Sequence, residues 1–218
     1  LVIPLLFLAS IALAQSPGTF TATGNMTTDR VQHTATLLLD GKVLIAGGLM
    51  AGRDGGEFSI LSSAEIYNPA TGTFAPTGNL IRARHTHSAT LLPDGRALIA
   101  GGFGPLESNS GGCPLPSSCG QLTSAEIYDP SAGTFTLTGD MVALGGPAVL
   151  LPSGKVFISG TATQAQLYDP ALGTFSATPA RTPGRSVATL LANGQVLLPG
   201  SGDQGDVADP ATAPHRPT

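Results

Sequence analysis

With 218 residues the chain is long enough for one large domain. It is rich in Gly (29) and Pro (18), while only 11% of the residues are charged and 5% are aromatic, a composition that suits short strands and frequent turns. Because 10 Lys and Arg stand against 14 Asp and Glu, the net charge is −4, and no basic stripe is available for a phosphate backbone. We therefore expect no nucleic-acid partner.

The chain begins with an almost wholly apolar stretch, LVIPLLFLASIALA, which ends in the small-x-small pattern Ala12-Leu13-Ala14. Signal peptidase cleaves after such a pattern, so we expect residues 1–14 to be a secretory signal peptide and the mature protein to be secreted or extracytoplasmic. A membrane anchor is the alternative. About 20 apolar residues are needed to span a bilayer, and this run is shorter and contains Pro4, so we expect no stable membrane span.

A hairpin segment then occurs four times along the chain. Each copy consists of two apolar, β-rich runs joined by Asp-Gly, Ser-Gly or Asn-Gly, pairs that tolerate the positive φ of a tight turn. The copies are HTATLLLDGKVLIAGG at 33–48, HSATLLPDGRALIAGG at 87–102, GPAVLLPSGKVFISG at 146–160 and SVATLLANGQVLLPG at 186–200. The pattern predicts four β-hairpins.

A second signature follows the first three hairpins. It is SAEIYNPATGTF at 63–74, SAEIYDPSAGTF at 124–135 and QAQLYDPALGTF at 164–175. The alternation in Ala-Glu-Ile-Tyr predicts a third strand that is packed on both faces, Asx-Pro starts a turn, and Phe anchors a fourth strand. Each repeat should therefore hold four strands, which in the first repeat are 33–39, 42–47, 63–67 and 73–77.

Repeats of about 50 residues with four strands, Gly-Gly after the second and Tyr-Asp-Pro after the third, are typical of propeller blades. Over residues 18–210 the chain resembles a kelch-repeat β-propeller of the bacterial, galactose-oxidase-like kind. The resemblance implies an all-β fold of four-stranded antiparallel blades, three whole and a fourth split or partial. The propeller would occupy residues 15–210, and 211–218 would form an irregular tail.

The ends of the repeat region leave two arrangements open. Residues 17–26 match the tail of a repeat, with a fourth strand at 19–23, and the last repeat has GDVADP in place of AEIYDP. Pairing of 19–23 with 205–208 would close a four-bladed ring. The resemblance favours an open arc of a larger propeller, since propellers of this kind usually have six or seven blades.

The kelch-like repeat opens with Arg-x-x-His, which is present in the first two repeats and absent from the last two. His33 and His87 hold equivalent repeat positions, so we expect them to be structural and to bond loop backbone, whereas His85 lies outside the pattern and is the better ligand candidate. The loops after the second strand and the connections between repeats share one face, which we call the loop face, and they carry the irregular features. The candidate binding residues on this face are Arg82, Arg84, His85, His87, Arg30 and His33.

Cys113 and Cys119 lie in one long connection of the second repeat. In a secreted protein, two cysteines this close in sequence favour a local disulfide. Two free thiols, or half of a metal site, are the alternatives.

These features favour a secreted, non-catalytic binding module that presents the loop face to a protein or glycan. The resemblance also implies an alternative, a fragment of a galactose-oxidase-like copper enzyme whose active-site residues lie outside this chain. All three tyrosines occupy the repeat position and both cysteines lie in one loop, so we expect no catalytic residue, no metal and no cofactor. A repeat region that only spaces other domains is a third possibility.

Overall fold

A computed structural model of the chain describes residues 20–50, 58–106, 119–160, 164–181, 187–199 and 205–210. The regular elements of these residues are all β-strands. Within this part of the chain no helix is long and apolar enough to cross a membrane. The predicted signal peptide (1–14) and tail (211–218) lie outside the described residues.

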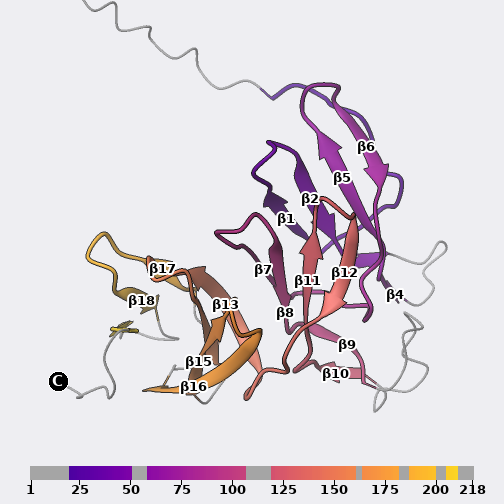
Figure 1. Cartoon of the computed structure of the whole chain (residues 1–218). Coiled ribbons are helices and arrows are strands. Elements are labelled where there is room, and N and C mark those ends of the chain that lie inside the picture. Colours follow the sequence, from indigo (N-terminus) through magenta and orange to yellow (C-terminus); the bar gives the residue numbers. More distant parts are fainter. Residues whose placement is uncertain are drawn as a thin grey trace, which may run out of the picture.

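Three antiparallel four-stranded sheets follow one another, and they confirm the all-β prediction with four strands in each repeat (Figure 1). Sheet 1 has the order β1 (Thr34–Leu37), β2 (Val43–Ala46), β5 (Ala64–Asn68) and β6 (Thr73–Pro76). Sheet 2 consists of β7 (Ser88–Leu91), β8 (Ala97–Ala100), β11 (Ala125–Asp129) and β12 (Thr134–Leu137). Sheet 3 consists of β13 (Gly145–Leu150), β14 (Val156–Gly160), β15 (Gln164–Asp169) and β16 (Thr174–Arg181).

A fourth sheet has three described strands, and two short ladders lie in the long connections. Sheet 4 contains β17 (Thr189–Leu190), β18 (Val196–Pro199) and β19 (Gly205–Ala208). The ladders pair β3 (Leu49–Met50) with β4 (Ser59–Ile60), and β9 (Phe103–Pro105) with β10 (Cys119–Gln121). The sequence predicted only loops there, because two- and three-residue strands leave no alternation to recognise.

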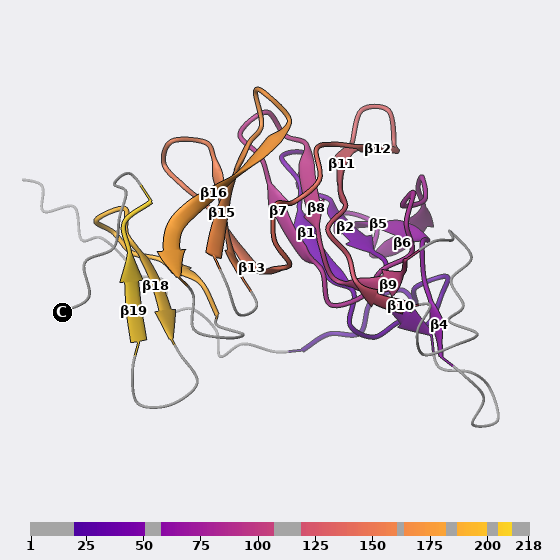
Figure 2. The same ribbon diagram turned by 90° about the horizontal axis from the view of Figure 1, so that it is seen from below.

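Successive sheets pack face to face through apolar side chains. The first strands, β1, β7, β13 and β17, contact one another in turn, and Figure 2 shows the sheets as a row from β1–β6 to β17–β19. Between sheets 1 and 2, Ile66 and Leu38 share a core cluster with Tyr128 and Phe135 of the next sheet. Ile127 belongs instead to the cluster shared with sheet 3. Alternation therefore sends Ile and Tyr to opposite faces, as predicted, and the structure adds that Ile faces the following sheet and Tyr the preceding one.

A Thr-Gly pair after the fourth strand joins sheet 1 to sheet 2 and sheet 2 to sheet 3. Thr77, which follows β6, shares a hydrogen bond of 2.8 Å with the hydroxyl of Tyr128, and the Gly78 amide donates to the Gly133 carbonyl at 2.9 Å. A Cβ on Gly78 would collide with that carbonyl oxygen, so glycine is required. We call this arrangement the Thr–Gly joint. It recurs between Thr138-Gly139 and Tyr168-Gly173, and between Thr23-Gly24 and Tyr67-Gly72.

The boundary between sheets 3 and 4 lacks this joint on both sides. The equivalent threonine, Thr178, is followed by proline and donates within its own sheet to the Ala165 carbonyl at 3.0 Å. The equivalent of the tyrosine is Ala208, which has no hydroxyl. Sheet 4 is therefore held to sheet 3 by a core cluster that contains no aromatic side chain from sheet 4.

The four-bladed ring is not found among the described residues. Residues 20–23 form no strand and do not pair with β19, whose described partner is β18. They lie instead against sheet 1, where the Gly24 amide donates to Gly72 at 2.8 Å. The described sheets thus form an open row.

The Thr–Gly joint and the Tyr–Phe pair should contribute measurably to stability. Tyr128 is 1% exposed and packs on Phe135 with ring centroids 4.8 Å apart, so Tyr128→Ala should lower the free energy of unfolding by roughly 3 kcal/mol. Thr77→Val, which removes only the hydrogen bond, should cost about 1 kcal/mol. Urea unfolding measures both changes in free energy. Tyr67→Ala is the control and should cost less, because Tyr67 is more exposed than Tyr128. A loss below about 1 kcal/mol for Tyr128→Ala would contradict the inter-sheet role.

Candidate functional site

A buried ion pair fixes the backbone on the loop face of sheet 2. The Arg84 guanidinium donates to the carbonyls of Gly101 (2.8 Å) and Ser124 (2.9 Å) and to Glu126 Oε1 (2.8 Å). Glu126 also accepts from the backbone amides of Ile81 (2.7 Å) and Arg82 (3.0 Å). Both charged side chains are 0% exposed, so these bonds replace the water that each has lost.

Sheet 1 repeats the arrangement with Arg30 and Glu65, which are 2.7 Å apart. Arg30 donates to the carbonyls of Gly47 (2.8 Å) and Ser63 (2.9 Å), and the Thr27 amide donates to Glu65 at 2.7 Å. Burial opposes ionisation of Glu65, but the Thr27 and Arg30 hydrogen bonds outweigh it and hold the pKa of the carboxyl below its ordinary value.

Sheet 3 uses an amide where the first two sheets use charges. Gln166 stands in the place of Glu126, and Ala143 in the place of Arg84. The Gln166 side chain accepts from the Val142 amide at 3.0 Å and donates to the Ala143 carbonyl at 2.8 Å. A neutral side chain with one donor group and one acceptor group thus takes over the role of the ion pair.

His87 lies between sheets 1 and 2 and is almost completely buried. Its Nε2 shares a hydrogen bond of 2.8 Å with Thr34 Oγ1, so it bonds a side chain of the neighbouring sheet and not the loop backbone that we expected. Its Nδ1 has no hydrogen-bond partner among the described residues. Burial, together with the nearby Arg84 charge, lowers the pKa of His87 to about 3, so the ring is neutral at physiological pH.

A cavity of about 700 Å³ opens on the loop face. Its walls come from the segments around the first strands of all four sheets and from the ladder β9–β10. The described residues that line it are Gln32, His85, Thr86, His87, Ser88, Gly102, Phe103, Gln121, Gly145, Gly146, Pro147 and Val187. None of them is Asp, Glu, Lys or Arg. Burial lowers the pKa of His85 too, so the lining is uncharged at neutral pH.

His85 and Phe103 form one wall of this cavity. Each donates its backbone amide to the carbonyl of the other, at 3.0 and 2.9 Å, and their rings lie 5.6 Å apart at 51°. Phe103 remains 37% exposed. The wall therefore offers an aromatic ring held in place by backbone bonds.

Two residues beside the cavity have left-handed backbone conformations. Thr86 has φ 49° and Gln32 has φ 55°, and the Thr86 amide donates to the Gln32 carbonyl at 3.1 Å. Positive φ is particularly unfavourable for a β-branched residue such as threonine, and it persists only where the surroundings impose it. Such strain is concentrated at binding and active sites.

The structure separates the six candidate binding residues into different environments. His85 and His87 line the cavity, and His33 does not. Arg30 and Arg84 are buried in ion pairs. Arg82 lies farther out, where it donates to the Leu106 carbonyl at 3.1 Å.

Sequence reasoning missed Gln32, Phe103 and Gln121 as lining residues. Gln32 and Thr86 directly precede His33 and His87, so the sequence repeat already indicated that the two residues hold equivalent positions. Phe103 directly follows Gly-Gly, but its inward placement depends on the bridge to His85.

The metal and disulfide predictions concern histidines, cysteines and carboxylates of the loop face. Among the described residues no group of three His, Cys, Asp or Glu side chains could hold a metal ion. Cys113 lies outside the described residues, while Cys119 begins β10 and is not a free cysteine. The bridge between them stays a prediction.

Comparison with known proteins supports the fold. No protein-family model and no curated protein matches the chain. Among solved structures, one described as "Structure of YjhT" matches with a TM-score of 0.59 and 16% sequence identity over 78% of this chain. The chain spans 58% of the length of that structure. At this identity the likeness shows a similar fold and carries nothing about activity.

The Arg84–Glu126 pair can be tested by imitating sheet 3. Arg84→Ala leaves a buried, unpaired carboxylate and should lower the free energy of unfolding by roughly 3–5 kcal/mol. The double variant Arg84→Ala/Glu126→Gln reproduces the Ala143 and Gln166 pattern and should be more stable than the single variant. Urea unfolding provides the comparison. A double variant less stable than Arg84→Ala would refute the equivalence of the two arrangements.

His87 should make stability depend on pH. Between about pH 6.5 and 3 the unfolded chain binds a proton at His87 that the native chain does not, so the free energy of unfolding falls as the pH falls. From pH 7 to pH 5 this contribution is about 2 kcal/mol. In His87→Gln the pH-dependent loss should be smaller by that amount, as measured by urea unfolding, whereas in His85→Gln it should change less. An unchanged dependence in His87→Gln would show that His87 titrates normally.

Proposed function

We propose that the chain is a secreted, non-catalytic binding module of the kelch β-propeller type that presents its loop face to a glycan. Secretion is supported by the apolar stretch at 1–14 and its small-x-small end, which are typical of a signal peptide. The kelch assignment is supported by Arg-x-x-His, Gly-Gly and Tyr-Asp-Pro in a repeat whose four strands form one sheet.

The observation that carries the proposal is the uncharged, polar and aromatic lining of the 700 Å³ cavity. A neutral sugar presents hydroxyl groups and apolar C–H faces. Gln32, Gln121 and Ser88 supply amide and hydroxyl groups for the former, and the exposed ring of Phe103 supplies an apolar surface for the latter. A few polar groups in an otherwise apolar concave site are typical of small-ligand pockets.

The backbone around the cavity is held before any ligand arrives. Buried Arg84 bonds the Gly101 carbonyl immediately before the lining residue Gly102, and the Thr86–Gln32 bond joins two walls. A preorganised site loses less conformational entropy on binding than a mobile one. This supports recognition of a small, defined epitope and favours a glycan over a large protein surface.

Glycan-array binding of the purified protein tests the proposal. Phe103→Ala and Gln121→Ala should each weaken binding of a neutral glycan at least about tenfold, because they remove the stacking surface and one amide. Leu172→Ala is the matched control, since Leu172 is 73% exposed in the turn between β15 and β16, on the opposite face.

Two outcomes would overturn the proposal. Glycan binding that is unchanged in Phe103→Ala would move the site away from the cavity. Stoichiometric copper in the purified protein, together with substrate-dependent production of peroxide, would establish the oxidase-like alternative.

A further inference from the structure

Residues 18–24 have the sequence of the fourth strand of a repeat, but no described sheet contains residues 20–23. GTFTATG at 18–24 corresponds to GTFAPTG at 72–78 and GTFTLTG at 133–139, which contain β6 and β12. Among the described strands none pairs with residues 20–23. Phe20 is fully exposed, whereas the equivalent Phe135 is buried.

This segment nevertheless holds the position that a preceding sheet would give it. Its Thr23-Gly24 joint contacts Tyr67 and Gly72 with the same bonds that Thr77-Gly78 makes to sheet 2. The Tyr67–Phe74 pair, with centroids 4.7 Å apart, is only partly buried on this side of sheet 1. The equivalent pair Tyr128–Phe135 is covered by sheet 1.

Sheet 4, at the other end of the row, is incomplete in the complementary way, because its described strands number three and not four. The outer edge of β19 carries no fourth strand among the described residues. Val207 is exposed, although its equivalents Ile66, Ile127 and Leu167 all belong to clusters shared with a following sheet. As far as the described residues show, sheet 4 thus presents an unpaired backbone edge and an uncovered apolar side chain, both of which favour association.

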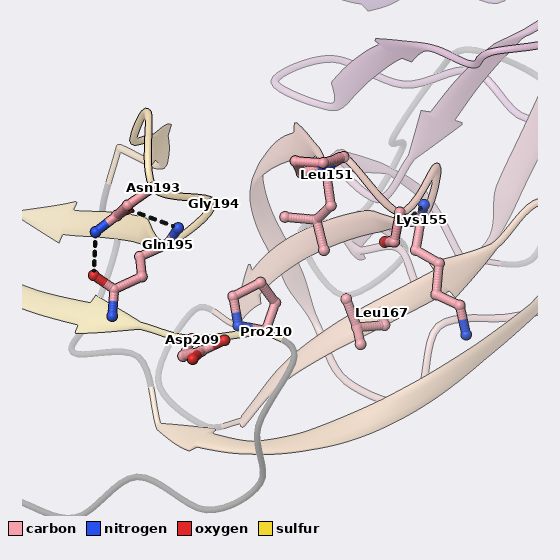
Figure 3. Close-up of a pocket in the computed structure, with 10 residues that line it drawn as sticks. Leu151, Lys155, Leu167, Asn193, Gly194, Gln195, Asp209 and Pro210 are labelled. Atoms are coloured by element: carbon pink, nitrogen blue, oxygen red, sulfur yellow. Dashed lines mark hydrogen bonds between the residues drawn. The ribbon is translucent and has the colours of Figure 1, made fainter.

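A cavity of about 570 Å³ lies between sheets 3 and 4 (Figure 3), and one of about 500 Å³ occupies the equivalent position between sheets 1 and 2. Leu151 and Leu167 form the apolar wall of the cavity between sheets 3 and 4, and Pro210 lies opposite them (Figure 3). Leu151 is the equivalent of Leu92, which shares a cluster with Tyr168 and Phe175. Ala208 replaces the tyrosine in the core cluster between sheets 3 and 4, so this boundary holds no Tyr–Phe pair.

We propose that a second copy of this chain completes sheet 4. Residues 20–23 of one copy add to the edge of β19 in the other, and Phe20 packs beside Ala208 on the face of sheet 4 that is turned to sheet 3. In sheet 3, Tyr168 pairs with Phe175 and Leu167 with Ser176. The same register places Phe20 opposite Ala208, and Thr21 opposite Val207.

The segment 20–23 and the edge of β19 lie at opposite ends of the row of sheets, so two copies would meet head to tail. Figures 1 and 2 show residues 20–24 beside sheet 1 and β19 at the other end of the row, and the Thr–Gly joint fixes the former to sheet 1. Strand addition satisfies the edge of β19 and brings sheet 1 of one copy against Val207 of the other. The contact is heterologous, because two different surfaces of the chain meet.

Mixing two single-cysteine variants distinguishes a contact between copies from one within a chain. In a Cys113→Ser/Cys119→Ser background, Thr21→Cys and Val207→Cys chains should form a disulfide-linked dimer when they are mixed and oxidised. Thr21→Cys mixed with Leu172→Cys is the matched control and should not. A bond that forms only inside a chain carrying both Thr21→Cys and Val207→Cys would establish ring closure and overturn the proposal. The absence of any bond would overturn it as well.

Sedimentation of the unmodified sequence gives an independent measurement. The chain should associate with increasing concentration, and Phe20→Ala should weaken the association at least about tenfold. Phe58→Ala removes another exposed phenylalanine and should leave the association unchanged. A chain that stays monomeric, or whose association is insensitive to Phe20→Ala, would overturn the proposal.

Discussion

The buried pair of Arg84 and Glu126 is the constraint on which the loop face depends. Two fully desolvated charges are tolerated only if nearly all their hydrogen-bonding capacity is used, and here the partners are backbone groups from three separate segments. The end of β8, the residue before β11 and the incoming connection from sheet 1 are therefore fixed together. Any displacement of one segment would leave a buried charge without a partner.

Successive sheets are connected by two different kinds of contact at their two ends. On the loop face, the Arg84 carbonyl accepts from the Gly48 amide of the preceding sheet, so the ion pair and Gly-Gly cooperate. On the opposite side, the Thr–Gly joint places a hydroxyl and a backbone amide against the next Tyr and Gly. Glycine is needed at both contacts, because a Cβ at Gly47 or Gly78 would collide with a backbone oxygen of the neighbouring sheet. The high glycine content thus reflects close packing between sheets as well as turns.

At the boundary between sheets 3 and 4, both partners of the Thr–Gly joint are altered. Where Ala208 replaces tyrosine, the preceding threonine no longer faces a hydroxyl and Thr178 turns back to Ala165. The result is a boundary without a Tyr–Phe pair, in contrast to the two boundaries before it. A binding surface and an association surface can coexist on this scaffold, because the first is formed at the loop face and the second at the ends of the row.

The repeats, the four strands of each full repeat, the hairpin turns and the opposite facing of Ile127 and Tyr128 could all be predicted from the sequence. These features depend on short-range patterns: alternation with a period of two, Asp-Gly turns and Asx-Pro turns. The burial of Arg30 and Arg84 in ion pairs could not be predicted, because their partners Glu65 and Glu126 lie 35 and 42 residues away in the sequence. An arginine in the same sequence context could equally contact a ligand. The ion pairs, the position of Phe103 beside His85 and the separation of residues 20–23 from β19 became evident only in the folded chain. Contacts between sheets are set by packing across distant segments, which no local pattern records.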